Sequence, residues 1–218
     1  MNLHKNFIRI EITPPMREIA VYHARRRSEK IKRRFVPENA PLSALESNFV
    51  GALGEVAVRY LFSGQKELKD DYDLGKTDSG DVRINGKMYD IKSEGVPLSL
   101  YIKLYEGRIK PYEPYGCRVW TAKHLAHLPK YDGGVIFTAL PIMQTEQQKQ
   151  DELLRKDILE GMDHLIILGY ALPEEIRAKK PQRYSPPHPV SGKRYPYYSP
   201  NMVFHHSELH PVHSLINR

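Results

Sequence analysis

The sequence predicts an α/β fold with a central mixed β-sheet flanked by helices. An amphipathic segment with helix-capping residues at both ends spans residues 43–62. The dipeptide Asn85-Gly86 predicts a tight β-hairpin. Two short apolar runs bounded by turns, at residues 133–140 and 165–170, predict buried strands. Because strands alternate with helices along the chain, the pattern is typical of an α/β sheet.

Composition limits the class of protein. The 218 residues are enough for one substantial core, and 40% hydrophobic against 27% charged residues argues for a soluble globular chain rather than disorder. No apolar run approaches the roughly 18 to 20 residues that a membrane helix needs. The single cysteine, Cys117, excludes an intramolecular disulfide framework and a cysteine-based zinc site. One cysteine also fits a reducing cytosol, so we expect a cytoplasmic protein.

A formal net charge of +7 favours polyanionic partners, nucleic acid first and an acidic membrane surface second. Much of this charge lies in a predicted N-terminal helix. Thr13 and the prolines after it favour a helix start, nothing breaks residues 16–34, and Pro37 ends the segment. The cations that we expect to hold a phosphate backbone are Arg25, Arg26, Arg27, Lys30, Arg33 and Arg34. The alternative is a solvated charged helix face.

The next helix is the best defined in the chain. Ser43 and Glu46 form an S-x-x-E capping box, apolar residues follow at close to a 3.6-residue period, and Gly64 ends the helix. Glu46 is therefore explained by its capping role.

Glu55 is the acidic residue of this helix that capping does not explain. It flanks the apolar stripe and follows Gly54, where a backbone or a ligand can approach closely. The alternative, which the helix alone favours, is an i,i+4 ion pair with Arg59.

The predicted hairpin fixes which residues share a face. With a two-residue turn, Val82 faces Tyr89 and Asp81 faces Asp90. The strand period of two places two sets on opposite faces. The core face carries Val82, Ile84, Tyr89 and Ile91. The other face carries Asp81, Arg83, Met88, Asp90 and Lys92.

Asp81 and Asp90 form the most informative pair. Their Cβ atoms would lie about 4.5 to 5.5 Å apart, where like charges repel. A divalent cation between them would turn that repulsion into a site, since hard oxygen ligands suit Mg²⁺ or Mn²⁺. Lys92, on the same face, would orient a water molecule or stabilise charge developing on a phosphate. A longer loop or a bulge would change this pairing.

The remaining segments add elements but no further chemistry. Residues 96–116, rich in Tyr, Lys and Pro, predict an irregular substrate-facing segment or ordinary edge strands. A short helix is expected from Thr121 to Leu128 and a polar helix at residues 144–160. Six prolines between residues 181 and 200 exclude regular structure there. The histidines that follow match no zinc motif and favour surface or packing roles: His205, His206, His210 and His213.

Three of these features together resemble a known family. They are Gly54-Glu55 on an early helix, Gly80-Asp81 at a strand start, and Asp90-Ile91-Lys92 on the next strand of a hairpin. This order resembles the PD-(D/E)XK nuclease superfamily, the restriction-endonuclease-like fold. The resemblance covers roughly residues 43–94, and glycine at position 80 stands where the family name has proline. It implies a restriction-endonuclease-like core within the α/β fold.

The resemblance also implies roles for individual residues. The catalytic set would be Glu55, Asp81, Asp90 and Lys92. Asp81, Asp90 and the Ile91 carbonyl would hold the metal ion, Mg²⁺ with Mn²⁺ as a substitute. Glu55 would bind a second metal ion or a metal-bound water.

The function implied is metal-dependent hydrolysis of phosphodiester bonds by a prokaryotic or phage nuclease. DNA is favoured over RNA and an endonuclease over an exonuclease, with a possible homodimer and no membrane partner. Two alternatives stay open. One is a nucleic-acid-binding protein with a nuclease-like fold and no catalysis. The other is a protein-binding module with solvated hairpin acids, which predicts that Asp81 and Asp90 do not converge with Glu55.

The expected organisation has three parts. Residues 1–40 would form a basic N-terminal helical arm, and residues 41–180 the nuclease-like α/β core. Residues 181–218 would be a Pro-, Tyr- and His-rich C-terminal extension that packs on the core or on a partner.

Overall fold

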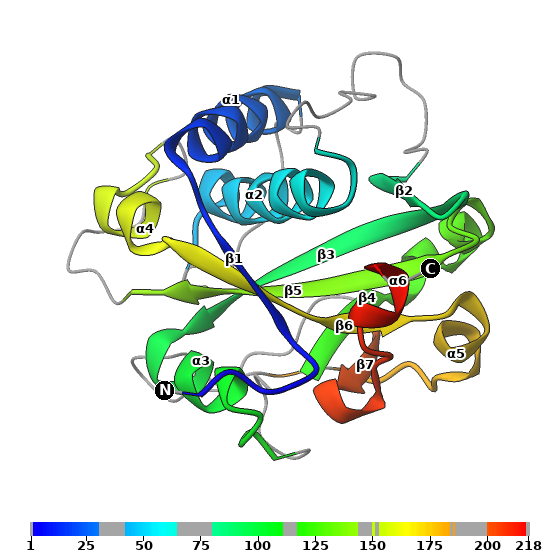
Figure 1. Ribbon diagram of the computed structural model, residues 1–218. Helices are drawn as coiled ribbons and strands as arrows, with labels where there is room; N and C mark the ends of the chain where they lie inside the picture. Colours follow the sequence, from blue (N-terminus) through cyan, green and yellow to red (C-terminus); the bar gives the residue numbers. More distant parts are fainter. Residues whose placement is uncertain are drawn as a thin grey trace.

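A computed structural model describes residues 2–30, 42–64, 80–110, 117–143, 150, 153–183, 185 and 200–216. It confirms an α/β fold built on a mixed five-stranded sheet (Figure 1). In spatial order the strands are β1 (Ile8–Glu11), β6 (His164–Ala171), β5 (Gly134–Ile142), β3 (Lys87–Pro97) and β2 (Val82–Ile84). Strands β3 and β5 run parallel, and the other neighbouring pairs are antiparallel.

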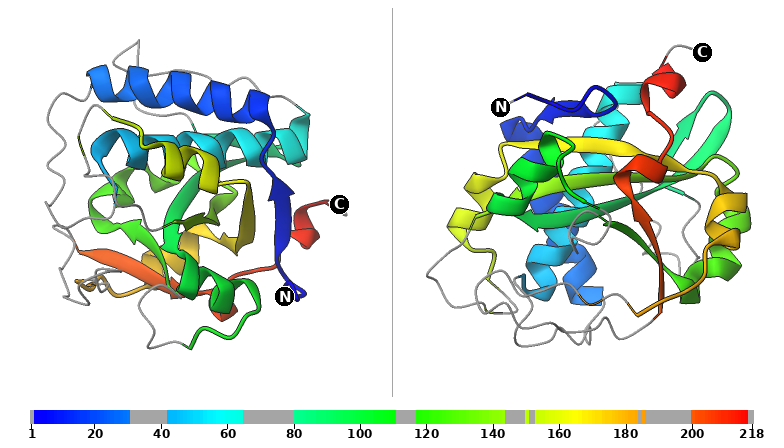
Figure 2. Two further views of the ribbon diagram at one scale, coloured as in Figure 1. Left: turned by 90° about the vertical axis from the view of Figure 1, so that its left-hand side faces the viewer. Right: turned by 90° about the horizontal axis from the view of Figure 1, so that it is seen from below.

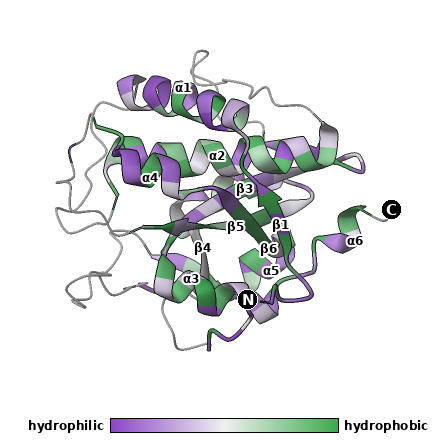
Figure 3. Ribbon diagram, turned by 60° about the vertical axis from the view of Figure 1, so that its left-hand side comes forward, coloured by the Kyte–Doolittle hydropathy of each residue, from purple (hydrophilic) through white to green (hydrophobic). Residues whose placement is uncertain are grey.

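Two long helices, α1 (Pro14–Lys30) and α2 (Ala44–Ser63), lie side by side over one face of this sheet (Figures 1 and 2). Helix α2 lies next to the sheet, and α1 lies on the far side of α2. The apolar core between helices and sheet includes Phe49, Leu53, Val56, Ile91, Ile136 and Leu140. Figure 3 shows the resulting contrast, since α1 is largely hydrophilic whereas β5 and β6 are largely hydrophobic.

The opposite face of the sheet is covered by shorter elements (Figure 1). They include α3 (Leu98–Tyr105), the 3₁₀ helix η3 (Ala122–Lys130), α5 (Pro173–Ala178), and an antiparallel pair of β4 (Cys117–Thr121) and β7 (Asn201–His205). A second apolar core forms beneath them, with Tyr101, Leu104, Leu128, Phe137, Ile166 and Met202. Covered on both sides, β5 is buried at every residue, as expected for a strand with a parallel neighbour.

Three further short elements complete the described chain: α4 (Lys156–Gly161), η4 (His206–Glu208) and α6 (His213–Ile216). Beyond β7, the backbone of His210 exchanges two hydrogen bonds with Tyr170 of β6. The segment after residue 200 is thus attached to the core through β4 and β6. At the other end of the chain, β1 joins the central sheet before the basic helix begins. Within the described residues, no helix is both long and apolar enough to cross a membrane.

The two predicted helix starts are confirmed. Helix α1 begins at Pro14, and residues 31–41 of the expected basic segment lie outside the described chain. For α2, the Ser43 hydroxyl accepts the Glu46 amide at 3.1 Å, and the Glu46 carboxylate accepts the Ser43 amide at 2.8 Å. Gly64 ends α2 in the left-handed conformation, with φ +67°.

Glu46 does more than cap its helix. Its side chain is fully buried, and its two carboxylate oxygens accept from Arg155 Nε at 2.6 Å and Arg155 Nη2 at 2.8 Å. The Arg155 backbone amide also donates to it at 3.2 Å. This bidentate pair joins α2 to the segment before α4, 109 residues later, and no local pattern in the sequence signals it.

The expectation for residues 96–116 was wrong at residues 98–105. An irregular or edge-strand segment was expected, whereas Leu98–Tyr105 is helix α3. Tyr101, Leu104 and Tyr105 have helical spacing and are buried in the second core, so two expected substrate-facing tyrosines are packing residues. Residues 111–116 lie outside the described chain.

Two other segments differ in extent. The 3₁₀ helix η3 runs past the expected end at Leu128, and the Thr121 side chain does not cap it. Of the polar helix expected at residues 144–160, the structure shows α4 from Lys156, while residues 144–149 and 151–152 lie outside the described chain. Most of the proline-rich stretch at 181–200 lies outside it as well.

Candidate functional site

The predicted hairpin and its register are confirmed. Val82 pairs with Tyr89, Arg83 with Met88, and Ile84 with Lys87. Asn85 and Gly86 both have positive φ, +50° and +81°, as a two-residue hairpin turn of type I′ requires. The predicted core face is also correct, because Val82, Ile84, Tyr89 and Ile91 are all buried in the first core.

Asp81 lies one residue before the ladder begins, so it is not a registered partner of Asp90. Its amide donates to the Tyr89 carbonyl at 2.9 Å. Its carboxylate turns toward the neighbouring strand and accepts the Ile91 amide at 2.6 Å. The Asp81 carboxylate therefore lies against the peptide that joins Asp90 to Ile91, although the ladder itself stops short of it.

Asp90 and Lys92 form an ion pair on β3. The Lys92 ammonium lies 3.0 Å and 2.9 Å from the two carboxylate oxygens. Asp90 is only 1% exposed, whereas the Lys92 side chain is 37% exposed. The buried carboxylate is thus balanced by a cation that retains access to solvent.

The pKa of Lys92 reveals which charges surround it. Burial acts to lower the pKa of this ammonium. The surrounding carboxylates outweigh burial and raise the pKa, with Asp90 the largest contributor, followed by Asp81 and Glu55. Lys92 is therefore fully charged at neutral pH. Asp90 contacts the Lys92 ammonium directly, and Asp81 and Glu55 belong to its electrostatic neighbourhood through their charge.

Gly54 brings Glu55 into this neighbourhood. A Cβ atom at position 54 would lie 1.8 Å from the Ser93 hydroxyl and 3.0 Å from the Thr138 hydroxyl. Only glycine lets α2 approach β3 and β5 this closely. The Thr138 hydroxyl donates to Ser93 at 2.8 Å, which fixes the surface on which the helix rests. The next residue of α2, Glu55, is thereby held near the residue before Ser93, which is Lys92.

Glu55 is bound by an arginine from the other helix. Arg27 of α1 contacts both carboxylate oxygens, through Nη1 at 2.8 Å and through Nη2. The side chains are only 10% and 14% exposed. The sequence suggested Arg59 of the same helix as a partner, whereas the contact with Arg27, 28 residues away, was not predicted. A signal exists in the spacing of α1, where Arg27 continues the fully buried stripe of Met16, Ala20 and Ala24.

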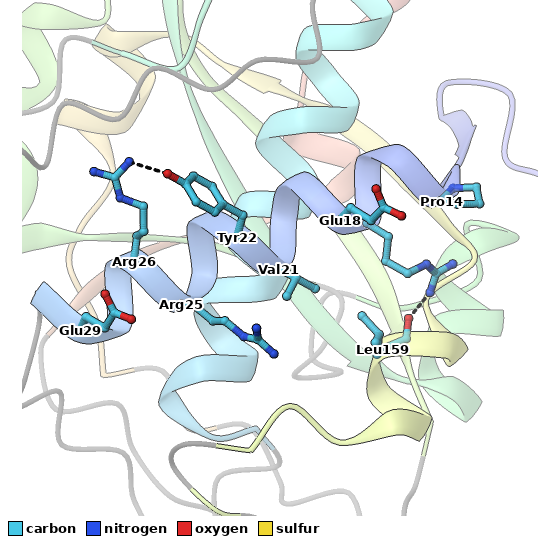
Figure 4. A pocket seen from close by; sticks show the side chains of 9 residues that line it. Pro14, Glu18, Val21, Tyr22, Arg25, Arg26, Glu29 and Leu159 are labelled. Carbon is cyan, nitrogen blue, oxygen red and sulfur yellow. Dashed lines mark hydrogen bonds between the residues drawn. The ribbon is translucent and has the colours of Figure 1, made fainter.

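The other basic residues of α1 have different surroundings. Arg25 is exposed, and Arg26 donates to the Tyr22 hydroxyl at 2.9 Å with its guanidinium 5.5 Å from the ring centroid. Both line an open groove of about 690 Å³ along the outer side of α1, closed at one end by Leu159 (Figure 4). The Lys30 side chain, Arg33 and Arg34 lie outside the described residues.

The donor set around Lys92 fits a hard divalent cation. Asp81, Asp90 and the backbone at Ile91 supply oxygen atoms, the ligand type that Mg²⁺ and Mn²⁺ prefer. Within the part of the chain that the structure describes, there is no group of three or more His, Cys, Asp or Glu side chains placed to hold a metal ion. The hairpin offers two carboxylates, Asp81 and Asp90, as candidate ligands, and Glu55 is engaged by Arg27.

The C-terminal histidines have packing partners. His205 and His206 are buried, and their Nε2 atoms lie 3.0 Å and 3.4 Å from the Ile109 carbonyl oxygen. His210 contacts the Glu175 carboxylate at 2.8 Å. The first two contacts join β7 and η4 to the segment after α3, and the third joins the segment after η4 to α5.

Comparison with known proteins finds no relative of this chain. No family model matches the chain, and neither the curated proteins nor the solved structures give a significant match.

Proposed function

We propose that this protein is a metal-dependent nuclease with a restriction-endonuclease-like core, which hydrolyses phosphodiester bonds in DNA. The observation that carries the proposal is the arrangement at the hairpin, where the buried Asp90 carboxylate pairs with Lys92 and the Asp81 carboxylate accepts the Ile91 amide. The order of Glu55, Asp81, Asp90 and Lys92 along a helix and a hairpin is the order that the PD-(D/E)XK superfamily uses. A hairpin with acids serving only as solvated surface would have no reason to bury Asp90.

Each residue has a part in this proposal. Asp81, Asp90 and the Ile91 carbonyl would hold Mg²⁺, or Mn²⁺ in its place. A cation held there would supply Lewis-acid chemistry, polarising the scissile phosphate and favouring deprotonation of water. Lys92 is charged and partly exposed, so it can leave Asp90 to orient that water or to balance charge developing on the phosphate.

The outer side of α1 would bind the nucleic-acid backbone. Arg25 is exposed there, and the contacts would be electrostatic and sensitive to salt. Arg26 and Tyr22 present a cation and an aromatic ring together, a pairing that suits phosphate contacts and base stacking. We favour an endonuclease acting on DNA because that is what the resemblance implies, and the same resemblance makes a homodimer possible.

A second candidate is a nucleic-acid-binding protein with the same fold and no catalysis. One observation favours it. Glu55 and Asp90 are each bound through both oxygens by a cation of the same chain. In a binding protein these pairs would be permanent, whereas in a nuclease the Lys92 pair must open when the metal ion binds.

The test is cleavage of supercoiled, linear and single-stranded DNA with Mg²⁺ or Mn²⁺. Wild type is compared with Lys92→Ala and with Lys87→Ala, which removes the same charge from an exposed site on the same hairpin. We expect metal-dependent cleavage by wild type and Lys87→Ala, and a loss of about 100-fold or more in Lys92→Ala. Salt-sensitive DNA binding without cleavage by wild type would favour the second candidate.

A further inference from the structure

We infer that Arg27 is a positioning residue. It holds the Glu55 carboxylate beside the metal site and keeps it out of direct metal coordination, so that a single divalent cation binds, on Asp81 and Asp90. This inference rests on the metal-dependent function proposed above. It decides between the two roles that the resemblance leaves to Glu55, a ligand of a second metal ion or a contact to coordinated water.

Arg27 is unlike its neighbours in the basic segment. Arg25 is exposed and Arg26 reaches Tyr22 on the outer side of α1, while Arg27 is buried against α2. It occupies the position on the inner stripe of α1 that follows Ala24 by three residues. A phosphate backbone on the outer side of α1 would therefore meet the first two arginines and not Arg27.

The contact with Glu55 occupies both carboxylate oxygens. A bidentate guanidinium–carboxylate pair is among the strongest charge-assisted hydrogen-bonding arrangements, and at 10% and 14% exposure it is little weakened by water. A metal ion that used Glu55 as a ligand would have to displace Arg27 and leave a buried guanidinium without its counter-charge.

The helices that carry this pair are fixed on both sides. Asn48 of α2 donates to the Ser28 hydroxyl of α1 at 2.9 Å, one residue after Arg27. Gly54 of α2 packs on Ser93 and Thr138 of the sheet. Glu55 thus has an arginine on one side and the Lys92 neighbourhood on the other, and little freedom to turn toward a different ligand.

The charge of the site favours one cation. Three carboxylates against Arg27 and Lys92 leave a formal charge of −1. One divalent cation brings this to +1 and a second would bring it to +3 in a partly buried site, where repulsion between charges is stronger than in water. Removal of Arg27 would lower the formal charge to −2 and release Glu55 for coordination.

The experiment is calorimetric titration of Mn²⁺ into protein without nucleic acid. The variants are Arg27→Met, Glu55→Gln and Asp90→Asn, with Arg25→Met as the matched control that removes one charge from the exposed side of α1. We expect one Mn²⁺ per wild-type chain and loss of binding in Asp90→Asn. We expect Arg27→Met to tighten Mn²⁺ binding by about 10-fold or to add a second ion, and Arg25→Met to have a much smaller effect because its charge is screened.

The sign of the Arg27→Met effect decides the question. If Glu55 were a direct ligand supported by Arg27, removing the support would weaken Mn²⁺ binding by about 10- to 100-fold, which would overturn the inference. Two ions on wild type, or loss of binding in Glu55→Gln equal to that in Asp90→Asn, would also overturn it. Wild type that binds no Mn²⁺ would contradict the proposed metal site itself.

A second variant, Arg27→Lys, keeps the inference testable if Arg27→Met does not fold. Its readouts are the Mn²⁺ stoichiometry and the separate values of kcat and KM. Arg27→Lys keeps the charge but loses the two-pronged contact, so we expect one Mn²⁺ ion, unchanged KM for DNA and a lower kcat. A purely structural role for Arg27 predicts instead that kcat per folded molecule, calibrated by circular dichroism, stays at the wild-type value in Arg27→Lys.

Discussion

Helix α2 carries two glutamates nine residues apart, and each is bound through both oxygens by an arginine from a distant part of the chain. The Glu46 side chain is fully buried and joins the start of the helix to the segment before α4. Glu55 is 14% exposed and is one of three carboxylates that act on Lys92. The same pairing chemistry thus has two uses, one that holds the fold together and one that arranges a candidate catalytic site.

The comparison predicts that the pair at Glu46 matters most for stability. Replacing Arg155 by Met leaves a buried carboxylate without its counter-charge, which costs about 3 to 5 kcal/mol of unfolding free energy. Urea denaturation measures this loss. Where the variant is still folded, the proposed nuclease activity per folded molecule should equal that of wild type. A selective loss of activity would mean that Glu46 also belongs to the site.

Glu55→Gln should behave in the opposite way. Its stability loss is smaller, about 1 to 3 kcal/mol, because the pair is less buried. Its kcat should fall by roughly 100-fold, since an anion beside Lys92 is lost. Single-turnover cleavage beside urea denaturation separates the two effects. Equal losses of stability and activity in Arg155→Met and Glu55→Gln would contradict the distinction between the two pairs.

Two glycines of α2 offer a sharper test of how Glu55 is placed. In Gly54→Ala the new Cβ would overlap the Ser93 hydroxyl, so we expect a loss of about 1 to 3 kcal/mol together with lower activity. In Gly51→Ala the nearest atom, Arg27 Nη1, lies at an ordinary 3.8 Å. That change should stabilise the helix by about 0.5 to 1 kcal/mol. Thermal unfolding of the two variants measures the difference, and a stable, active Gly54→Ala would contradict the close packing.

The partly exposed ion pair between Lys179 and Glu208 should have the smallest effect on stability. Burial acts to raise the pKa of Glu208, but the Lys179 ammonium and the His205 amide outweigh it and lower that pKa. A lowered pKa means that the stabilisation is complete above the ordinary value of 4.5 and is lost as pH falls through the folded-state value. The stability gap between wild type and Glu208→Gln should be at most about 1 kcal/mol near pH 6 and should close toward pH 3. A gap that widens on acidification, in urea titrations at each pH, would reverse this assignment.

Local patterns in the sequence predicted the parts of the fold that depend on neighbouring residues. The capping box at Ser43, the turn at Asn85-Gly86 and the buried strand β5 each rest on a few consecutive residues. The candidate acids could be placed for the same reason, since the hairpin register follows from its turn. Helix α3 could not, because Tyr101 and Tyr105 fit the spacing of a helix as well as that of a strand pattern with amphipathic tyrosines.

The two buried arginine–glutamate pairs could not be predicted from local sequence patterns. Arg27 meets Glu55 across 28 residues and Arg155 meets Glu46 across 109, and both contacts arise from the packing of elements rather than from spacing. The sequence showed Arg27 as one of three consecutive arginines, with nothing in composition to separate it from Arg25 and Arg26. Its place on the stripe of Met16, Ala20 and Ala24 is the single sequence feature that distinguishes it.

The most direct test of the account is nicking of supercoiled DNA by wild type and Asp90→Asn, each with Mg²⁺ and with a chelator. The substitution keeps the shape of the side chain and removes one proposed metal ligand. We predict cleavage by wild type that the chelator abolishes, and a rate at least about 100-fold lower in Asp90→Asn. Equal cleavage by the two proteins, or cleavage by wild type that persists in chelator, would contradict a metal site at this hairpin.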